Sequence, residues 1–167
     1  MTICHDCTQF RITRQDGSET EILLGASLDE QCILNQLKKE KIACFKSRSA
    51  KSICIQIGAE DDSDLEYEIL CINEFSSERK MMSVVVKEKA TERYFCFAKG
   101  AESQIFASLS SESAESTLKK KVEAETFNFG SKGLRTLVFA MREMTKEEID
   151  SIDWNSSNTK ALSEACE

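Results

Sequence analysis

The sequence predicts an α+β fold in which a mainly antiparallel sheet is flanked by helices, giving two layers. Strand-like runs follow one another directly along the chain, and runs connected in this way pair most readily in the antiparallel sense. Helical segments with recognisable start signals are inserted between these runs, so that they can cover the sheet. With 167 residues and 41% apolar side chains, the chain is long enough to bury the core that such layers need.

The clearest helix start is at Ser27. Ser27 and Glu30 have the three-residue spacing of a capping box, and apolar residues recur at helical spacing after it. Two strand-like runs, residues 43–48 and 52–57, follow with a short turn between them and predict a hairpin. The acidic residues 60–64 then predict a solvated loop, because their spacing lacks the glycine and the carboxylate pattern of a common calcium loop.

Three further strands are predicted over residues 65–73, 82–87 and 93–98, where β-branched and aromatic side chains are frequent. A polar corner at residues 76–79 joins the first two of these strands. Phe75 is therefore expected close to a strand end.

Helical spacing returns over residues 101–109 and 115–127, and the serine-rich link 108–116 between them is expected to be mobile. Residues 134–141 have strand character. Thr145 and the acidic residues after it predict the start of a last helix.

The composition excludes several classes of protein. A formal net charge of −7 argues against a DNA- or RNA-binding protein, which normally presents a broad basic surface. No run approaches the roughly eighteen apolar residues that span a bilayer, and the start of the chain lacks the pattern of a secretion signal. We expect a soluble protein of cytosolic character, and the composition is compatible with a small anionic ligand held by a few placed cations.

The chain contains 8 cysteines, and without a secretion signal they are expected to be reduced thiols that fill apolar positions. Cys4 and Cys7 have the Cys-x-x-Cys spacing with His5 between them, which is compatible with half a zinc site or a redox pair. A closed zinc site needs two more ligands, and the sequence offers neither a second histidine nor a second Cys-x-x-Cys. We therefore predict no metal site, and core filling is the simpler interpretation.

Three separated segments together suggest one nucleotide site. They contain an aromatic ring, Phe75, on which a flat purine can stack, and three cations that can neutralise an attached triphosphate. A single lysine or arginine is normally a solvated surface residue, so it is the combination that carries the prediction. The cations are Lys80, Lys99 and Arg135, in segments 74–83, 99–101 and 133–137.

Common phosphate-binding loops are absent from the sequence. The only glycine-lysine cluster, residues 130–133, lacks the Walker A spacing and the hydroxyl residue that would hold Mg²⁺. A Gly-x-Gly-x-x-Gly dinucleotide fingerprint is also missing. ATP would therefore be held by side chains on a sheet.

These segments resemble the nucleotide-binding domain of P-type ATPases. Their amino-acid sequence is most similar to the type IV branch, the phospholipid-transporting ATPases or flippases. The resemblance begins at Thr2-Ile3-Cys4-His5, includes Ser27-Leu28-Asp29-Glu30 and continues through all three segments, covering most of the chain. It implies the fold of that domain over residues 1–167 as one domain. It also implies a fragment of a larger membrane ATPase, without the phosphorylation, actuator and transmembrane domains.

The resemblance also assigns roles to individual residues. Glu30 falls where the family has a carboxylate that accepts from the adenine amino group, although as the third residue of a capping box it can equally serve the helix start. Lys99 corresponds to a lysine deep in the ATP pocket, and Gly100 would let the ligand approach the backbone. Ser77 and Thr136 are candidate hydroxyl donors to the nucleotide.

The implied activity needs a second domain. P-type ATPases form an aspartyl phosphate on an Asp-Lys-Thr-Gly-Thr motif, which this chain does not contain. The chain is thus expected to bind ATP and present its γ-phosphate to that aspartate, without hydrolysing ATP by itself. Mg²⁺ would be held mainly by the phosphorylation domain, in a cytoplasmic part of an integral membrane protein that can work with a small accessory subunit.

Two departures leave alternatives open. Met81 stands where flippases usually carry a second basic residue, and Leu28 where they usually carry proline. A cation-transporting or orphan P-type ATPase would keep the mechanism and change the cargo. A non-enzymatic interaction module, using the acidic surface and the serine-rich link 108–116, is the alternative from another class.

Overall fold

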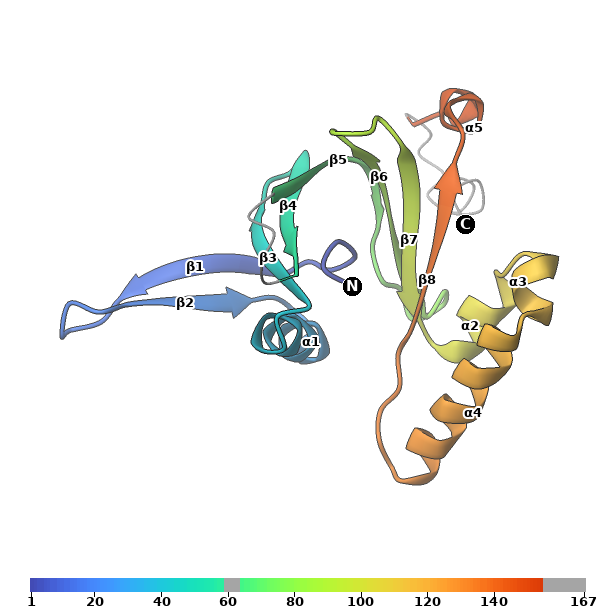
Figure 1. The fold of residues 1–167 in the computed structure, drawn as a ribbon, viewed down its shortest axis with the longest axis horizontal. Helices are drawn as coiled ribbons and strands as arrows, with labels where there is room; N and C mark the ends of the chain where they lie inside the picture. Colours follow the sequence, from blue (N-terminus) through green and yellow to red (C-terminus); the bar gives the residue numbers. More distant parts are fainter. Residues whose placement is uncertain (59–63, 155–167) are drawn as a thin grey trace. The chain divides into compact units, whose positions relative to one another are not determined.

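The computed structural model describes residues 1–58 and 64–154 (Figure 1). Of the acidic loop predicted over residues 60–64, residues 60–63 lie outside the described residues, and Asp64 is the first residue of β5. The strands are β1 Thr8–Thr13, β2 Glu19–Leu24, β3 Ala43–Arg48, β4 Ser52–Ile57, β5 Asp64–Asn73, β6 Met81–Glu88, β7 Tyr94–Gly100 and β8 Val138–Met144. The helices are α1 Leu28–Lys39, α2 Glu102–Ala107, α3 Ser111–Glu115, α4 Thr117–Ser131 and α5 Lys146–Ser151.

The predicted fold class is confirmed. A six-stranded antiparallel sheet has the order β3-β4-β5-β6-β7-β8, and β1 pairs with β2 in a separate two-stranded sheet. The chain divides into two compact units, of which the first is Met1–Leu70 with Val86–Tyr94 and the second is Cys71–Val85 with Phe95–Glu167. That residues 1–167 act as one domain stays a prediction.

The strands between residues 43 and 100 agree with the sequence prediction to within two residues at each end. The reason is visible in β6, where residues 81–86 are all buried. A continuous run of valine and methionine is the pattern of a strand covered on both faces. Local sequence therefore determined these elements.

In the first unit, the hairpin of β1 and β2 was not predicted. Asp16 and Gly17 form its turn, Gly17 has a φ of +82°, and the Asp16 carboxylate accepts from the Ser18 N–H at 2.9 Å. An Asp-Gly pair between runs of alternating apolar residues is a known hairpin signal. The hairpin was missed because Phe10 and Ile12 are exposed on a strand rich in polar residues.

Helix α1 begins where the capping signal places it. The Ser27 hydroxyl accepts from the Glu30 N–H at 3.4 Å, and α1 packs on β3 with Leu34 and Phe45 buried (Figure 1). Exposed ion pairs such as Lys38 to Glu21, 2.8 Å apart, add little to stability. The apolar contacts between α1 and β3 therefore stabilise this part of the first unit.

In the second unit, the segment after β7 departs from the prediction in two places. The serine-rich link contains the short helix α3, whose N-cap Ser110 accepts from the Ser113 N–H. The last strand begins at Val138 and not at Leu134, because α4 ends late: Gly133 has a φ of +74° and the Leu134 N–H still bonds to the Phe129 carbonyl at 3.1 Å. The helix start predicted at Thr145 is confirmed, and the structure shows it to be a capping box, in which Thr145 and Glu148 each cap the other's backbone.

The second unit is organised by a small apolar cluster. Met81 at the start of β6, Ile105 in α2 and Val138 at the start of β8 are all buried against one another, with Ala98 of β7 packed beside them. Helix α2 also contacts β8 and α4 (Figure 1). Burial of Met81 explains why an apolar side chain fits where the resemblance led us to expect a basic one.

A close approach of two strands lies next to this cluster. A Cβ added to Gly100 would lie 2.6 Å from the Lys80 carbonyl oxygen and 2.6 Å from the Met81 Cβ. The Ala101 N–H donates to the same Lys80 carbonyl at 3.0 Å. Only glycine lets the end of β7 lie this close to the start of β6.

Replacing Gly100 with alanine is expected to lower the free energy of unfolding by about 1–3 kcal/mol, because the new methyl group would overlap atoms of the neighbouring strand. Urea unfolding measures the change. Gly130→Ala is the matched control, since Gly130 lies in α4 and, among the described residues outside its own helix backbone, no atom lies within 4 Å of an added Cβ. Alanine also favours a helix, so this control should keep or gain stability. Equal losses in both variants would contradict the explanation.

Candidate functional site

The turn between β5 and β6 carries the predicted aromatic residue. At its base the Asn73 side chain donates to the Ser83 hydroxyl at 3.0 Å, and both residues are buried. Within it the Lys80 N–H bonds to the Ser76 carbonyl at 2.7 Å, and the Ser76 hydroxyl accepts from the Arg79 N–H at 3.2 Å. The sequence analysis treated residues 76–79 only as a polar corner. Ser76 and Arg79 have the same three-residue spacing as Ser27 and Glu30, but Arg79 lacks the carboxylate of a capping box, so the sequence carried no such signal here.

The structure brings two of the three predicted segments into contact. Lys80 has a φ of +54°, which is unusual for a residue with a side chain. Hydrogen bonds hold it on both sides, because its N–H bonds to Ser76 and its carbonyl accepts from Ala101. The end of the 74–83 segment and the 99–101 segment are thus fixed against each other.

The third segment, residues 133–137, is the connection from α4 to β8. It leads directly into Val138, which packs with Met81 in the apolar cluster. Arg135 therefore lies three residues before Val138, which packs against Met81, the residue that follows Lys80. Arg135 and Thr136 lie in this connection and not within a strand, which corrects the strand expected over 134–141.

The predicted residues differ in exposure in a way that suits different roles. Phe75 has 61% of its surface exposed, so its ring is accessible to a flat ligand. Ser77, Lys80 and Arg135 are exposed, whereas Thr136 is half-buried. Lys99 is only 6% exposed. Since lysine is rarely buried without a role, Lys99 departs from the solvated side chain that an arbitrary lysine would be.

Gly100 has an explanation that the sequence did not supply. Its lack of a side chain is required by the Lys80 carbonyl and by Met81, as described above. That a ligand also approaches its backbone stays a prediction. The absence of a side chain at Gly100 thus allows segments 74–83 and 99–101 of the predicted site to pack closely.

A cavity of about 260 Å³ in the second unit lies apart from these residues. Its wall includes Cys96 and Ala98 of β7, Ile105 of α2 and Ala140 of β8. Successive side chains alternate between the faces of a strand, so Lys99 belongs to the other face of β7. The predicted nucleotide-binding residues are not part of this cavity wall.

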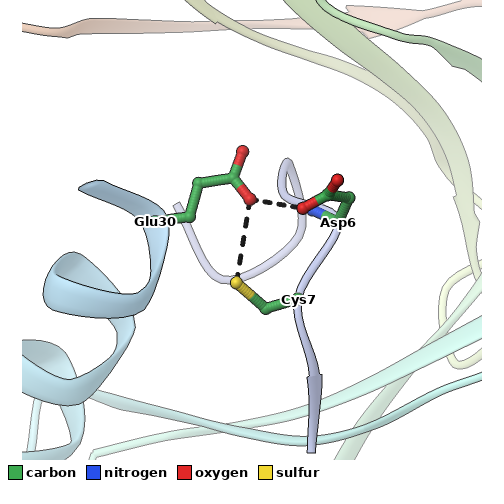
Figure 2. Close-up of side chains that lie close together, drawn as sticks. All are labelled: Asp6, Cys7 and Glu30. Carbon is green, nitrogen blue, oxygen red and sulfur yellow. Dashed lines mark hydrogen bonds between the residues drawn. The ribbon is translucent and has the colours of Figure 1, made fainter. Parts of the chain in front are cut away.

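Glu30 belongs to the first unit, where it is 9% exposed. Figure 2 shows its carboxylate turned toward the segment before β1: Oε2 accepts from the Asp6 N–H at 3.1 Å and from the Cys7 thiol at 3.7 Å. Glu30 thus links the first turn of α1 to the N-terminal segment. Its predicted contact with adenine stays a prediction, while this structural use is an observation.

His5 has a structural role in the same segment. Its Nδ1 accepts from the Cys7 N–H at 3.0 Å, which leaves the proton on Nε2, and Nε2 lies 3.0 Å from the Thr2 carbonyl oxygen. The ring also meets Phe45 edge to face, with 4.6 Å between centroids. Because both ring nitrogens bind backbone groups, His5 is not available as a metal ligand in this arrangement.

One group of potential metal ligands was found among the described residues. Ligand atoms of Asp6, Cys7 and Glu30 lie within 4.8 Å of one another. The Arg48 guanidinium donates to the His5 carbonyl beside them. Burial lowers the pKa of Arg48, while the nearby Asp6, Cys4, Glu30 and Cys7 groups oppose this shift. A cation of the protein itself is already adjacent, so we interpret the cluster as a charge network and not as a metal centre.

The chain as a whole matches a known family. Residues 1–165 match the family described as P-type ATPase, cytoplasmic domain N. The chain therefore belongs to this family of P-type ATPase domains, which confirms the resemblance that the sequence suggested.

Three similar proteins are phospholipid-transporting ATPases. The chain is 27% identical to phospholipid-transporting ATPase tat-1 of Caenorhabditis elegans over 162 residues, which are 97% of this chain and 13% of the relative. It is 31% identical to phospholipid-transporting ATPase NEO1 of Saccharomyces cerevisiae over 147 residues, or 88% and 12%. It is 33% identical to phospholipid-transporting ATPase DNF2 of the same yeast over 155 residues, or 90% and 9%.

The chain spans only about a tenth of the length of these relatives, so it corresponds to one part of a multidomain ATPase. Within residues 1–58 and 64–154, no helix combines the length and the apolar character needed to cross a membrane.

Glu30→Gln is expected to lower the free energy of unfolding by about 1–3 kcal/mol, because a charged acceptor for two donors is lost next to Arg48. Urea unfolding again provides the measurement. Glu19→Gln is the control, since Glu19 makes only an exposed ion pair with Arg11 at 3.6 Å and should change stability by less than about 0.5 kcal/mol. If Glu30→Gln were as stable as the control, the structural role of this carboxylate would be wrong.

Proposed function

We propose that this chain is the ATP-binding part of a P-type ATPase that translocates phospholipids, and that its second unit holds the nucleotide. The adenine ring stacks on Phe75, and the phosphates meet Lys80, Lys99 and Arg135. Ser77 and Thr136 donate hydrogen bonds, and the Gly100 backbone is open to the ligand. The observation that carries the proposal is the packing of Met81, which lies in the first segment, with Ala98 and Val138, which lie next to the other two segments.

Charge and burial support the division of roles. A triphosphate is attracted by several cations at once, and an ammonium in a buried position interacts more strongly than one in water. Lys99 is the buried cation, whereas Lys80 and Arg135 are exposed and can adjust to the phosphate tail. The exposed Phe75 ring supplies the one flat apolar surface among these residues.

Glu30 is the part of the proposal with a competing explanation. The resemblance assigns it to the adenine amino group, yet its Oε2 already accepts from Asp6 and Cys7. The ATP affinity of Glu30→Gln separates the two roles: a loss of affinity without a loss of stability supports the adenine contact.

The rest of the reaction belongs to other parts of the full-length protein. This chain has no Asp-Lys-Thr-Gly-Thr motif, so we propose that it presents the γ-phosphate to an aspartate on the phosphorylation domain of the same polypeptide. Mg²⁺ prefers oxygen ligands, and the ammonium and guanidinium groups proposed here do not fit as its ligands. The metal would accompany ATP and be held mainly by the phosphorylation domain.

The setting follows from the relatives' names. They are phospholipid-transporting ATPases, and we propose the same cargo class here, with this chain as a cytoplasmic domain of an integral membrane protein. A small accessory membrane subunit would contact other regions of that protein. We expect the isolated chain to be monomeric.

Phe75→Ala is expected to weaken ATP binding by at least about 1 kcal/mol, because base-aromatic stacking contributes about 1–3 kcal/mol per base. Calorimetry with ATP measures the dissociation constant. Phe127→Ala is the matched control, since Phe127 is an aromatic residue of α4 that is 78% exposed. Unchanged affinity in Phe75→Ala, or an equal loss in Phe127→Ala, would count against the proposed site.

The chain is also expected to bind ATP without hydrolysing it. Incubation with Mg²⁺ and ATP should release no phosphate above the uncatalysed rate, because no nucleophile for phosphoryl transfer is present. An amine-directed reagent should modify Lys99, and ATP should protect it, as mass spectrometry of the peptides would show. Lys121, an exposed lysine of α4, should be modified equally with and without ATP. Steady phosphate release, or no protection of Lys99, would contradict the assignment.

A further inference from the structure

Phe75 lies between two carbonyl groups that are each held by a hydrogen bond. The Glu74 carbonyl, on the peptide unit before Phe75, accepts from the Arg79 guanidinium (Nη1) at 3.2 Å. The Ser76 carbonyl, on the other side, accepts from the Lys80 N–H at 2.7 Å. The backbone on both sides of the exposed ring is therefore fixed by the following residues of the same turn.

Arg79 is itself held in position by this turn. Its N–H donates to the Ser76 hydroxyl at 3.2 Å, so backbone and side chain of the same residue bind on opposite sides of Phe75. Lys80 then takes the unusual φ of +54° and is bonded to Ala101. Such a conformation persists only where the surrounding bonds enforce it.

An exposed ring needs this kind of support if it is to bind a base. A side chain that is free to move loses conformational entropy when a ligand immobilises it, and that loss weakens binding. Restricting the backbone beforehand removes part of the cost. The bonds from Arg79 and Ser76 restrict the chain at the one position where the proposed site presents its aromatic surface.

We propose that Arg79, together with Ser76, is a positioning residue for the adenine-stacking ring of Phe75. Arg79 acts through the Glu74 carbonyl and does not contact the phosphates. This inference rests on the proposed function. It adds one residue, Arg79, to the three cations that are proposed to bind the phosphates. A positively charged side chain next to Lys80 would otherwise be counted as a fourth phosphate ligand, and the two roles make different predictions.

The test compares a ligand that has a base with one that lacks it. In calorimetry on the 167-residue chain, Arg79→Met is expected to weaken ATP binding about threefold to tenfold and to leave inorganic tripolyphosphate binding unchanged, since one supporting hydrogen bond is lost while the phosphate cations remain. Ser76→Ala should act in the same direction. Lys121→Met removes an exposed cation of α4 and should affect neither ligand.

A double-mutant cycle and a spectroscopic signal identify the route of the effect. Once Phe75 is alanine, Arg79→Met should weaken ATP binding no further, because the ring through which it acts is gone. In proton NMR at saturating ATP, the upfield shift of the adenine H2 and H8 signals caused by the Phe75 ring should decrease in Arg79→Met. If Arg79→Met does not fold, Arg79→Lys and Ser76→Ala provide the same comparison.

The outcomes separate this inference from the proposed function. Equal weakening of ATP and tripolyphosphate binding would make Arg79 a phosphate ligand and overturn the positioning role. An Arg79→Met effect that is additive with Phe75→Ala would also overturn it. If Phe75→Ala weakens ATP binding while Arg79→Met does not, the stacking site stands and only this inference fails. If the unmodified chain binds no ATP, both fail together.

Discussion

The second unit depends on the close approach between the end of β7 and the start of β6. Gly100 leaves room for the Lys80 carbonyl, Ala101 donates to that carbonyl, and Met81 turns into the apolar cluster with Ile105 and Val138. Close packing and apolar contacts, and not charge, therefore set the relative positions of the segments that carry Lys80 and Lys99. The three cations of the proposed site would repel one another. The packing of their segments would therefore have to supply the free energy that offsets this repulsion.

The proposed site would concentrate positive charge in a chain that is acidic as a whole. With a net charge of −7, the surface would on average repel a triphosphate. A site for ATP in such a chain therefore requires cations brought together from distant parts of the sequence. The buried Lys99 and the exposed Lys80 belong to segments that a backbone hydrogen bond joins, and in the proposed site both would meet the anionic ligand.

The first unit uses its polar groups differently. Glu30, Asp6, Cys7 and Arg48 form a network that fastens the N-terminal segment to α1, and His5 closes a turn with both ring nitrogens. A buried carboxylate next to a partly buried guanidinium is stable only when both are hydrogen-bonded. The residues that resembled a zinc or redox motif in the sequence are thus explained by the way this segment is held.

Local sequence was sufficient for most elements. Runs of apolar, β-branched and aromatic residues located β3 to β7, and capping signals located α1 and α5, because both depend on residues close together in the sequence. The same approach failed for β8, where a late helix end at Gly133 displaced the strand start, and for the exposed hairpin of β1 and β2. It identified Phe75, Lys80 and Lys99 by type and order, but it gave Gly100 a ligand-facing reason and overlooked Arg79.

By itself, the sequence determined the fold class, the family and the kinds of side chain available for a nucleotide. Only the tertiary structure decided that Gly100 meets Lys80, that Lys99 is buried and that Arg79 reaches back to Glu74. The physical reason is that these contacts depend on backbone distance and direction across a turn or between strands. Such quantities arise from the packing of the whole unit and leave no periodic trace in the chain.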